Sequence, residues 1–300
     1  MVQDAKDAQA LHLPAPCTTI DADWSWLVKL SRFLILGVVL SFSVACVQAQ
    51  TAGKRKYKVL AIGAVEGFQH DSTSHALATI WKMGQESGLY DTYIRTDTQL
   101  ITKKKLQGNA KNLDFFDAVI FYTTGELKLD DEQKASLLSF VREDGKGFIG
   151  VHSATDTFYQ WPEYGEMIGG YFDMHPWNTF QAPIIVEDRE FPATRHFPIE
   201  FTTYDEIYQV KNFSRDRVRV LARLDESKID LNNKNVRRTD KDFAVAWARN
   251  YGKGRVFYST FGHTFEAWER PDIQKMYFEA IRWALRLVDG DATPRPRPAQ

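Results

Sequence analysis

Short apolar runs and amphipathic segments alternate along the chain from residue 57 to residue 151. The apolar runs are four to six residues long and end at turn residues, which is typical of strands buried on both faces. The segments between them carry apolar residues at helical spacing, such as Leu77, Ile80 and Trp81. The pattern predicts strands at 58–63, 92–95, 118–122 and 147–151, and helices at 72–88 and 130–143.

The middle of the chain, residues 181–223, has a different pattern. Three apolar runs follow one another there without a helical segment between them, which predicts an antiparallel insertion or sheet extension with strands at 183–186, 206–210 and 218–221. Residues 228–241 are polar and predict a surface loop.

The earlier pattern then returns, and predicts parallel strands at 244–247 and 255–259 and a closing helix at about 272–288. Strands that alternate with helices through short links favour an α/β fold. We therefore predict one domain over residues 57–288, built on a doubly wound, mostly parallel open sheet with an antiparallel insertion.

The N-terminal segment has the organisation of an export signal. Residues 33–50 contain no charged side chain, Lys29 and Arg32 precede them, and Val47-Gln48-Ala49 is a small-residue cleavage box. We interpret residues 1–49 as a signal peptide or an N-terminal membrane segment, with translation starting near Val28. The predicted location is periplasmic or extracellular, with a lipid anchor at Cys46 or an uncleaved helical anchor as alternatives.

Composition narrows the function classes. The net charge is −1, from 38 basic and 39 acidic residues, and no basic stripe is present, so nucleic acid is not an expected partner. The two cysteines lie in the first fifty residues, which excludes a zinc ribbon, a disulfide scaffold or a CxxC redox site from the body of the chain. Residues 289–300, rich in proline and arginine, predict a disordered tail.

Polar side chains gather directly after the predicted parallel strands. Because ligands bind outside the carboxyl ends of such strands, these positions are the candidate site. The candidates that follow strands are His70, Glu126, His152, Asp156, His263 and Glu266, and an aromatic loop adds Tyr171, His175 and Trp177. Aromatic faces of this kind suit stacking on a sugar ring.

Two chemistries fit these candidates. Neutral imidazoles with a carboxylate could hold a divalent metal such as Zn, Mn, Ni or Fe, with His70, His152, His175 and His263 as candidate ligands. Alternatively, histidines and a carboxylate could act as a metal-free general acid and base. The second hypothesis is favoured, because no compact ligand signature such as HExxH is present.

Several other enzyme classes lack their motifs in this sequence. The glycines of Gly63-Ala64-Val65-Glu66-Gly67 do not have the spacing of a dinucleotide fingerprint, and there is no phosphate-binding loop. Ser153 follows a strand, but the G-x-S-x-G turn of a serine hydrolase is absent.

Three motifs together resemble the ThuA-like (trehalose utilisation) family. They are Gly150-Val151-His152-Ser153-Ala154-Thr155-Asp156, then Gly169-Gly170-Tyr171-Phe172 with His175-Pro176, and Tyr251-Gly252-Lys253-Gly254-Arg255-Val256-Phe257-Tyr258 with Gly262-His263. The resemblance spans about residues 57–287. It implies a flavodoxin-related fold of the class I glutamine amidotransferase type.

The resemblance also separates this chain from true glutamine amidotransferases. Those enzymes carry a cysteine nucleophile in a G-x-C-x-G turn, where this chain has His152, so glutamine hydrolysis by that route is excluded. The resemblance implies sugar metabolism, with trehalose-type disaccharides and their keto derivatives as candidate substrates. We expect an enzyme in which His152, His263 and Asp156 are catalytic; the alternative is a non-catalytic sugar-binding protein of the envelope.

The remaining candidates are assigned to substrate binding, and the membrane is expected to be contacted only through the N-terminal segment. The residues predicted to bind substrate are His70, Glu126, Tyr171, His175, Trp177 and Glu266.

Overall fold

The computed structural model describes residues 55–108 and 110–297. The predicted signal or membrane segment at residues 1–49 and the last three residues of the predicted tail lie outside the described residues. Among the residues described, no helix has the length and hydrophobicity needed to span a membrane.

Within the described part of the chain, nine strands form one sheet, and its centre is parallel. The parallel strands are β1 (Tyr57–Ile62), β2 (Tyr90–Arg95), β3 (Ala118–Phe121), β4 (Gly147–Val151) and β11 (Gly254–Ser259). Their order, β2-β1-β3-β4-β11, is the flavodoxin-like order of a doubly wound sheet. This confirms the predicted fold class.

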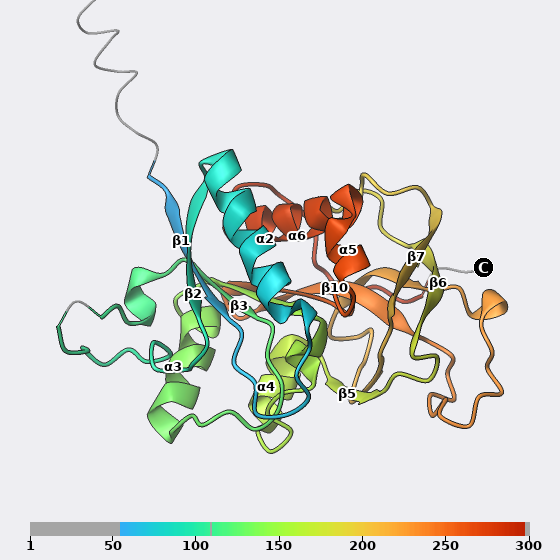
Figure 1. Cartoon of the computed structure of the whole chain (residues 1–300), viewed down its shortest axis with the longest axis horizontal. Coiled ribbons are helices and arrows are strands. Elements are labelled where there is room, and N and C mark those ends of the chain that lie inside the picture. The colour runs from blue at the N-terminus through green and yellow to red at the C-terminus, as the bar shows by residue number, and fades with distance from the viewer. Residues whose placement is uncertain (1–54, 109, 298–300) are drawn as a thin grey trace, which may run out of the picture. The chain divides into compact units, whose positions relative to one another are not determined.

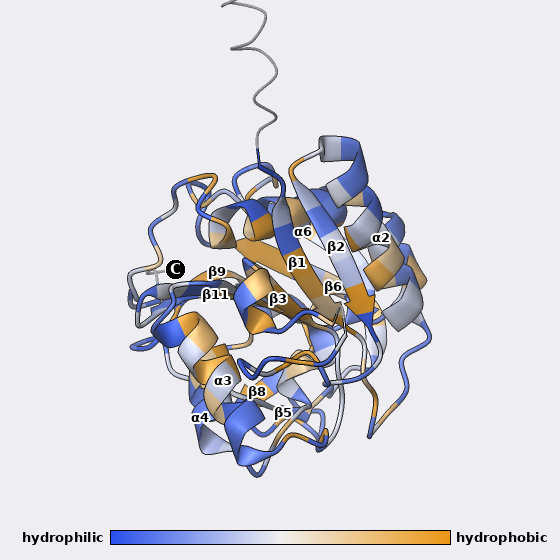
Figure 2. Cartoon of the chain, turned by 90° about the vertical axis from the view of Figure 1, so that its left-hand side faces the viewer, coloured by the Kyte–Doolittle hydropathy of each residue, from blue (hydrophilic) through white to orange (hydrophobic). Residues whose placement is uncertain are grey.

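Helices cover both faces of the sheet (Figure 1). One face is covered by α2 (Ser72–Ser87), α5 (Phe265–Glu269) and α6 (Pro271–Ala284). The other is covered by α3 (Asp131–Arg142) and α4 (Pro162–Ile168). Figure 2 shows this layering: strands such as β1 and β3 in the interior are largely hydrophobic, and the outer helices carry both hydrophobic and hydrophilic residues. Because both faces are covered, β3 and β4 are buried at every position, which explains why their sequences are continuous apolar runs.

The other half of the sheet is antiparallel. It consists of β10 (Ala244–Tyr251), β9 (Arg219–Leu224), β6 (Thr179–Val186) and β7 (Glu200–Glu206), in that order from β11. The prediction of a parallel strand at 244–247 is wrong, because β10 pairs antiparallel with both neighbours. The predicted strand at 206–210 is also wrong in extent: β7 ends at Glu206, and β8 (Gln209–Lys211) pairs with β5 (Tyr171–Met174) in a separate two-stranded sheet.

The direction of β7 decides the position of the site. Each of the four steps β11-β10, β10-β9, β9-β6 and β6-β7 reverses the strand direction. Four reversals restore the original direction, so β7 runs the same way as the central strands and Glu206 lies at a carboxyl end. Register shifts between β9 and β10 mark an irregularity of the kind that bends a sheet and re-aims its edge.

The described part of the C-terminal tail is packed against the domain, which differs from the predicted disorder. The Trp283 indole donates to the Gly290 carbonyl at 3.0 Å, and Ala292 is only 2% exposed. The Arg295 guanidinium donates to the Glu187 carbonyl at 2.6 Å. Composition does not predict these contacts, because they depend on which groups the fold places beside the tail, such as Glu187, which is 108 residues from Arg295.

Candidate functional site

His152 occupies a strained turn at the end of β4. Its φ is +43°, a left-handed conformation that is uncommon for a residue with a side chain. The ring is fully buried, and its Nδ1 lies 2.6 Å from the Thr260 carbonyl. A carbonyl only accepts, so Nδ1 carries the proton and the Nε2 lone pair is free to act as a ligand or a base.

Three other side chains each place a possible ligand atom near His152 Nε2. His70 follows β1, His263 follows β11, and Glu206 ends β7. One ligand atom from each of these residues and from His152 lies within 4.8 Å of the others. His263 Nδ1 is 3.2 Å from His152 Nε2 and 3.2 Å from Glu206 Oε2, while His152 Nε2 and Glu206 Oε2 are 3.7 Å apart. We call these four residues the His3Glu cluster.

Asp205 holds two members of the cluster in place. Its carboxylate accepts from the Gly262 amide at 2.7 Å and from the Thr264 amide at 3.2 Å. The Thr264 hydroxyl donates to the Tyr204 carbonyl at 3.1 Å. The end of β7 is therefore fixed to the loop that carries His263, although the two strands are far apart in sheet order.

His70 closes the cluster from the loop before α2. It is 5% exposed, and its ring lies edge-on to His152 and His263, with centroid distances of 4.9 and 5.1 Å. The Tyr208 hydroxyl lies 3.4 Å from His70 Nε2.

The electrostatics keep two of the three imidazoles neutral. Burial, together with the charge of the neighbouring His263, lowers the pKa of His70 to about 4. Burial also lowers the pKa of His152 well below its usual value. Burial opposes protonation of His263 too, but its hydrogen bond to Glu206 and the carboxylate charge outweigh this and raise its pKa.

The donor set fits a divalent metal. Neutral imidazole and carboxylate are ligands that Zn, Mn, Ni and Fe accept. With metal–ligand bonds of about 2.0–2.1 Å, neighbouring ligand atoms in a tetrahedral site are about 3.3 Å apart. The distances among His152, His263 and Glu206, which are 3.2, 3.2 and 3.7 Å, are close to that spacing, and His70 joins them within the 4.8 Å bound of the whole cluster. A histidine that binds a metal through one ring nitrogen ordinarily donates a hydrogen bond from the other, and His152 Nδ1 makes such a bond to the Thr260 carbonyl.

Three of the four cluster residues line a cavity of about 340 Å³. The cavity is lined by Phe68, His70, Asp156, Phe172, His175, Asn178, Thr179, Glu206, Tyr208 and His263. His175 Nδ1 is 3.4 Å from Glu206 Oε1, whereas His152 and His263 approach Glu206 Oε2. Asp156 accepts from the Tyr159 hydroxyl, and burial raises the pKa of this carboxyl.

The structure thus brings together five of the residues that the sequence proposed, and separates four others from them. Asp156 and His175 line the same cavity as His70 and His263, and the fully buried His152 contacts His263. Tyr171 is buried and donates to the Trp161 carbonyl, and Trp177 packs on Phe180 and Phe243. Glu126 accepts from the Gln160 amide on the surface, and Glu266 is exposed on α5. None of these four side chains lines the cavity, so their role in substrate binding stays a prediction and is not used in the proposal below.

Sequence reasoning missed Glu206, Tyr208 and Asp205. The predicted strand at 206–210 placed Glu206 at the start of a strand, whereas it ends one. The acidic pair Asp205-Glu206 was the available signal, because two adjacent carboxylates are unusual in a strand that is buried at that point.

Comparison with known proteins gives a family and a fold. A family model described as "ThuA: Trehalose utilisation" matches residues 58–284. No functionally curated protein matches the chain.

Two solved ThuA-like proteins share the fold. The one from Bacteroides uniformis is 22% identical, with a TM-score of 0.64, and the match covers 78% of this chain and 94% of that one. The one from Parabacteroides merdae is 17% identical, with a TM-score of 0.58 and coverages of 77% and 90%. The motifs around His152, His175 and His263 that suggested the resemblance lie within the matched residues, and the chain belongs to the ThuA (trehalose utilisation) family.

Proposed function

We propose that this protein is a divalent-metal-dependent enzyme that acts on a carbohydrate, with the His3Glu cluster as its metal centre. The observation that carries the proposal is the convergence of four ligand atoms within 4.8 Å. They come from four separate chain segments at one edge of the sheet. Bringing buried imidazoles and a carboxylate together without a ligand is costly, so a bound cation accounts for the arrangement.

This proposal replaces the metal-free hypothesis favoured from the sequence. A general base at neutral pH works best with a pKa near that pH. Burial lowers the pKa of both His70 and His152, however, which leaves them as neutral ligands. The roles of proton donor and acceptor fall instead to Asp156 and His175, which line the cavity beside the cluster.

The substrate class is proposed from the family description and the cavity. The family is described by trehalose utilisation, and trehalose-type disaccharides and their keto derivatives are the candidate substrates. A metal here would polarise a sugar carbonyl or hydroxyl oxygen. His175, whose Nδ1 lies 3.4 Å from Glu206 Oε1, and Asp156, hydrogen-bonded to Tyr159, would then remove or return a proton at the carbon adjacent to the polarised carbonyl.

Metal analysis tests the centre directly. We expect the purified protein, after reconstitution in turn with Zn, Mn, Ni and Fe, to hold about one equivalent of a divalent metal. His152→Ala and Glu206→Gln should lose it, because each removes a ligand. His75→Ala is the matched control, since His75 pairs with Glu269 outside the cluster. Full metal retention by both cluster variants would contradict the proposal.

Turnover tests the enzymatic part. We expect the metal-loaded protein to convert a trehalose-type or keto-disaccharide substrate, and His175→Ala to retain metal but lose at least about tenfold in rate, as general acid–base groups contribute about 10²–10⁴. Sugar affinity without any product would instead support the non-catalytic sugar-binding alternative.

We also propose export from the cytoplasm, on the charge-free apolar segment at residues 33–50. Sequencing the N-terminus of the protein from its native cell envelope tests this. A mature chain that begins after Ala49 is expected, and a cytoplasmic chain that retains Asp4 would contradict export.

A further inference from the structure

Phe68 is an exposed aromatic side chain at the edge of the candidate site. It is 63% exposed, more than any other large hydrophobic side chain among the described residues. It follows β1 in the loop that also carries His70, and it lines the cavity over the His3Glu cluster. A single exposed hydrophobic side chain is common on a protein surface, but this one lines the candidate site and contacts His70, which gives it access to a ligand bound there.

The loop around Phe68 is fixed by contacts to the loop after β3. The Thr124 hydroxyl donates to the Phe68 carbonyl at 2.8 Å, and the Glu66 amide donates to the Thr124 carbonyl at 2.9 Å. Gly125 has φ +83°, and a Cβ there would lie 2.6 Å from the Glu66 carbonyl carbon. The Phe68 ring meets the His70 ring edge-on, with 4.8 Å between centroids. Phe68 is thus presented to solvent by a backbone held on both sides.

The lining around Phe68 combines aromatic and polar groups. The Phe172 and Tyr208 rings lie 4.4 Å apart, and His175 stacks on Phe172 at 5.8 Å. Asp156 adds a carboxylate to the same lining. This combination suits a pyranose ring, which has an apolar face of C–H groups and a rim of hydroxyls. The cavity volume, 340 Å³, is at the small end of the range of about 300–1,000 Å³ for ligand sites.

We propose that Phe68 is the stacking platform for the apolar face of a pyranose ring bound over the His3Glu cluster. This inference rests on the proposed carbohydrate function and makes it more specific. It assigns a substrate with a closed ring and an unobstructed face, such as a glucopyranoside, rather than an open-chain polyol.

The test compares Phe68→Ala, Phe68→Tyr and Trp81→Ala by calorimetric titration with trehalose, methyl α-D-glucopyranoside and sorbitol. Trp81 is the matched control because it is 48% exposed on α2. We expect Phe68→Ala to keep its metal and to bind the two ring sugars about tenfold more weakly, a loss of about 1.4 kcal/mol. Phe68→Tyr should restore affinity, Trp81→Ala should match the wild type, and sorbitol should bind weakly to all.

The outcomes separate this inference from the proposed function. If the wild type binds the ring sugars and Phe68→Ala binds them equally well, the platform is wrong while the carbohydrate function stands. If the wild type binds none of the sugars, the carbohydrate function fails and the platform with it. If Phe68→Ala changes the oligomeric state on size exclusion but not sugar affinity, Phe68 contacts a second copy of the chain, and the inference is overturned.

Discussion

At the scale of single residues, the site contains titratable groups whose burial disfavours their charged form. Asp156 shows this most simply. Burial raises the pKa of its carboxyl, although the Tyr159 hydroxyl and the neighbouring His175 oppose the shift. A carboxylate that is penalised for its charge exchanges a proton with substrate more readily, so the property that reduces stability is useful for chemistry.

Asp156→Asn should make the protein more stable at neutral pH. Between the unfolded pKa of 3.8 and the raised native value, the native state binds more protons than the unfolded chain, so the contribution of Asp156 to stability falls as pH rises. Urea unfolding should therefore show a higher midpoint for Asp156→Asn at pH 7, with the gain disappearing below pH about 4. Turnover should be lost.

Asp289→Asn provides the control for this experiment, because the Asp289 side chain is fully exposed and its substitution should leave the midpoint unchanged at both pH values. A lower midpoint for Asp156→Asn at pH 7 would show that burial does not penalise this carboxylate.

At the scale of elements, close packing of helices on strands fixes the edge that carries the site. α2, which begins directly after His70 and Asp71, packs on β2, and Gly84 lies against Tyr90 of that strand. A Cβ on Gly84 would lie 2.6 Å from the Tyr90 ring and 2.7 Å from the Tyr90 carbonyl oxygen. The absence of a side chain at this position is therefore what allows the helix to lie against the strand.

Gly84→Ala should destabilise the protein, although the helix propensities of the two residues alone predict the opposite effect. Alanine in place of glycine inside a helix ordinarily stabilises by about 1 kcal/mol. Here the added methyl group meets backbone as well as a ring, so overpacking should cost about 1–3 kcal/mol in the free energy of unfolding. Lys82→Ala on the exposed side of α2 should change it by less than about 0.5 kcal/mol. Chemical denaturation measures both, and a more stable Gly84→Ala would refute the packing argument.

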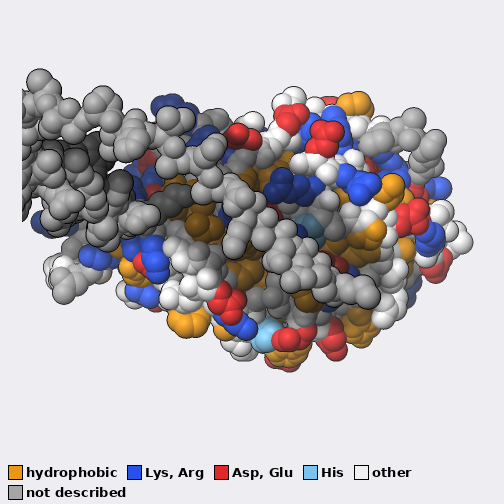
Figure 3. All heavy atoms as spheres, turned by 90° about the horizontal axis from the view of Figure 1, so that it is seen from above, with side chains coloured by type: hydrophobic (Ala, Val, Ile, Leu, Met, Phe, Trp, Pro, Cys, Tyr) orange, Lys and Arg blue, Asp and Glu red, His pale blue; other side chains and the backbone are white. Residues whose placement is uncertain are grey.

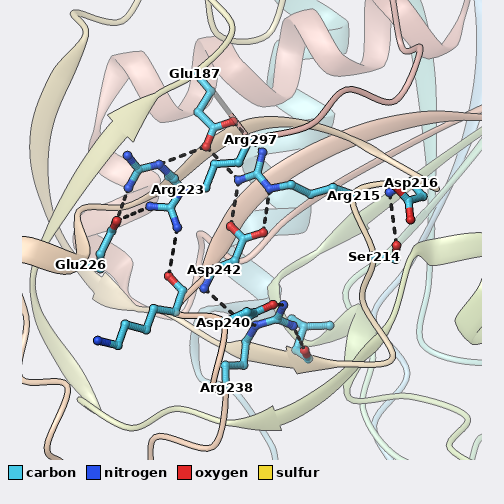
Figure 4. A network of polar contacts seen from close by, with 12 residues as sticks. Glu187, Ser214, Arg215, Asp216, Arg223, Glu226, Arg238, Asp240, Asp242 and Arg297 are labelled. Carbon is cyan, nitrogen blue, oxygen red and sulfur yellow. Dashed lines mark hydrogen bonds and ion pairs between the residues drawn. The ribbon is translucent and has the colours of Figure 1, made fainter. Parts of the chain in front are cut away.

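At the scale of the whole domain, a buried ion-pair network joins the antiparallel half of the sheet to the C-terminal tail (Figure 4). Arg215 makes paired hydrogen bonds to Glu187, both at 2.8 Å, and to Asp242, at 2.6 and 2.8 Å. Arg223 also pairs with Glu187, at 3.0 Å, and Arg297 in the tail pairs with Glu226. On the face shown in Figure 3, acidic and basic side chains are instead interspersed in contact with solvent.

Arg215→Ala should be among the most destabilising substitutions in the chain. It would leave the carboxylates of Glu187 and Asp242, which are 2% and 10% exposed, without their main partner. Breaking a buried pair in this way costs about 3–5 kcal/mol. Arg142→Ala, which removes an exposed pair with Glu143, should cost less than about 1 kcal/mol. Thermal and urea unfolding measure the difference. Similar decreases in the free energy of unfolding of the two variants would show that the buried network stabilises the protein no more than an exposed ion pair does.

The central strands could be predicted because their burial on both faces is visible in their own sequences. Helices cover β1, β3 and β4 on both sides, so each strand is a continuous apolar run that a sequence pattern reveals. β7 follows no such pattern. Its sequence, EFTTYDE, is polar over most of its length and exposed at three of seven positions, so its extent was misjudged and Glu206 was placed at the wrong end of a strand.

The sequence alone determined the family, the doubly wound sheet and the histidines at the strand ends, because each of these depends on the order of residues along the chain. The tertiary structure decided which of the candidates meet. Four reversals of strand direction bring Glu206, at the carboxyl end of β7, to the site. The hydrogen bond from His152 Nδ1 to the Thr260 carbonyl leaves the lone pair of the ring on Nε2. The tertiary structure also moved Tyr171 and Trp177 into packing roles. Such outcomes depend on contacts between residues that are distant in the chain, and their geometry is set only when the sheet, its bends and its covering loops are assembled.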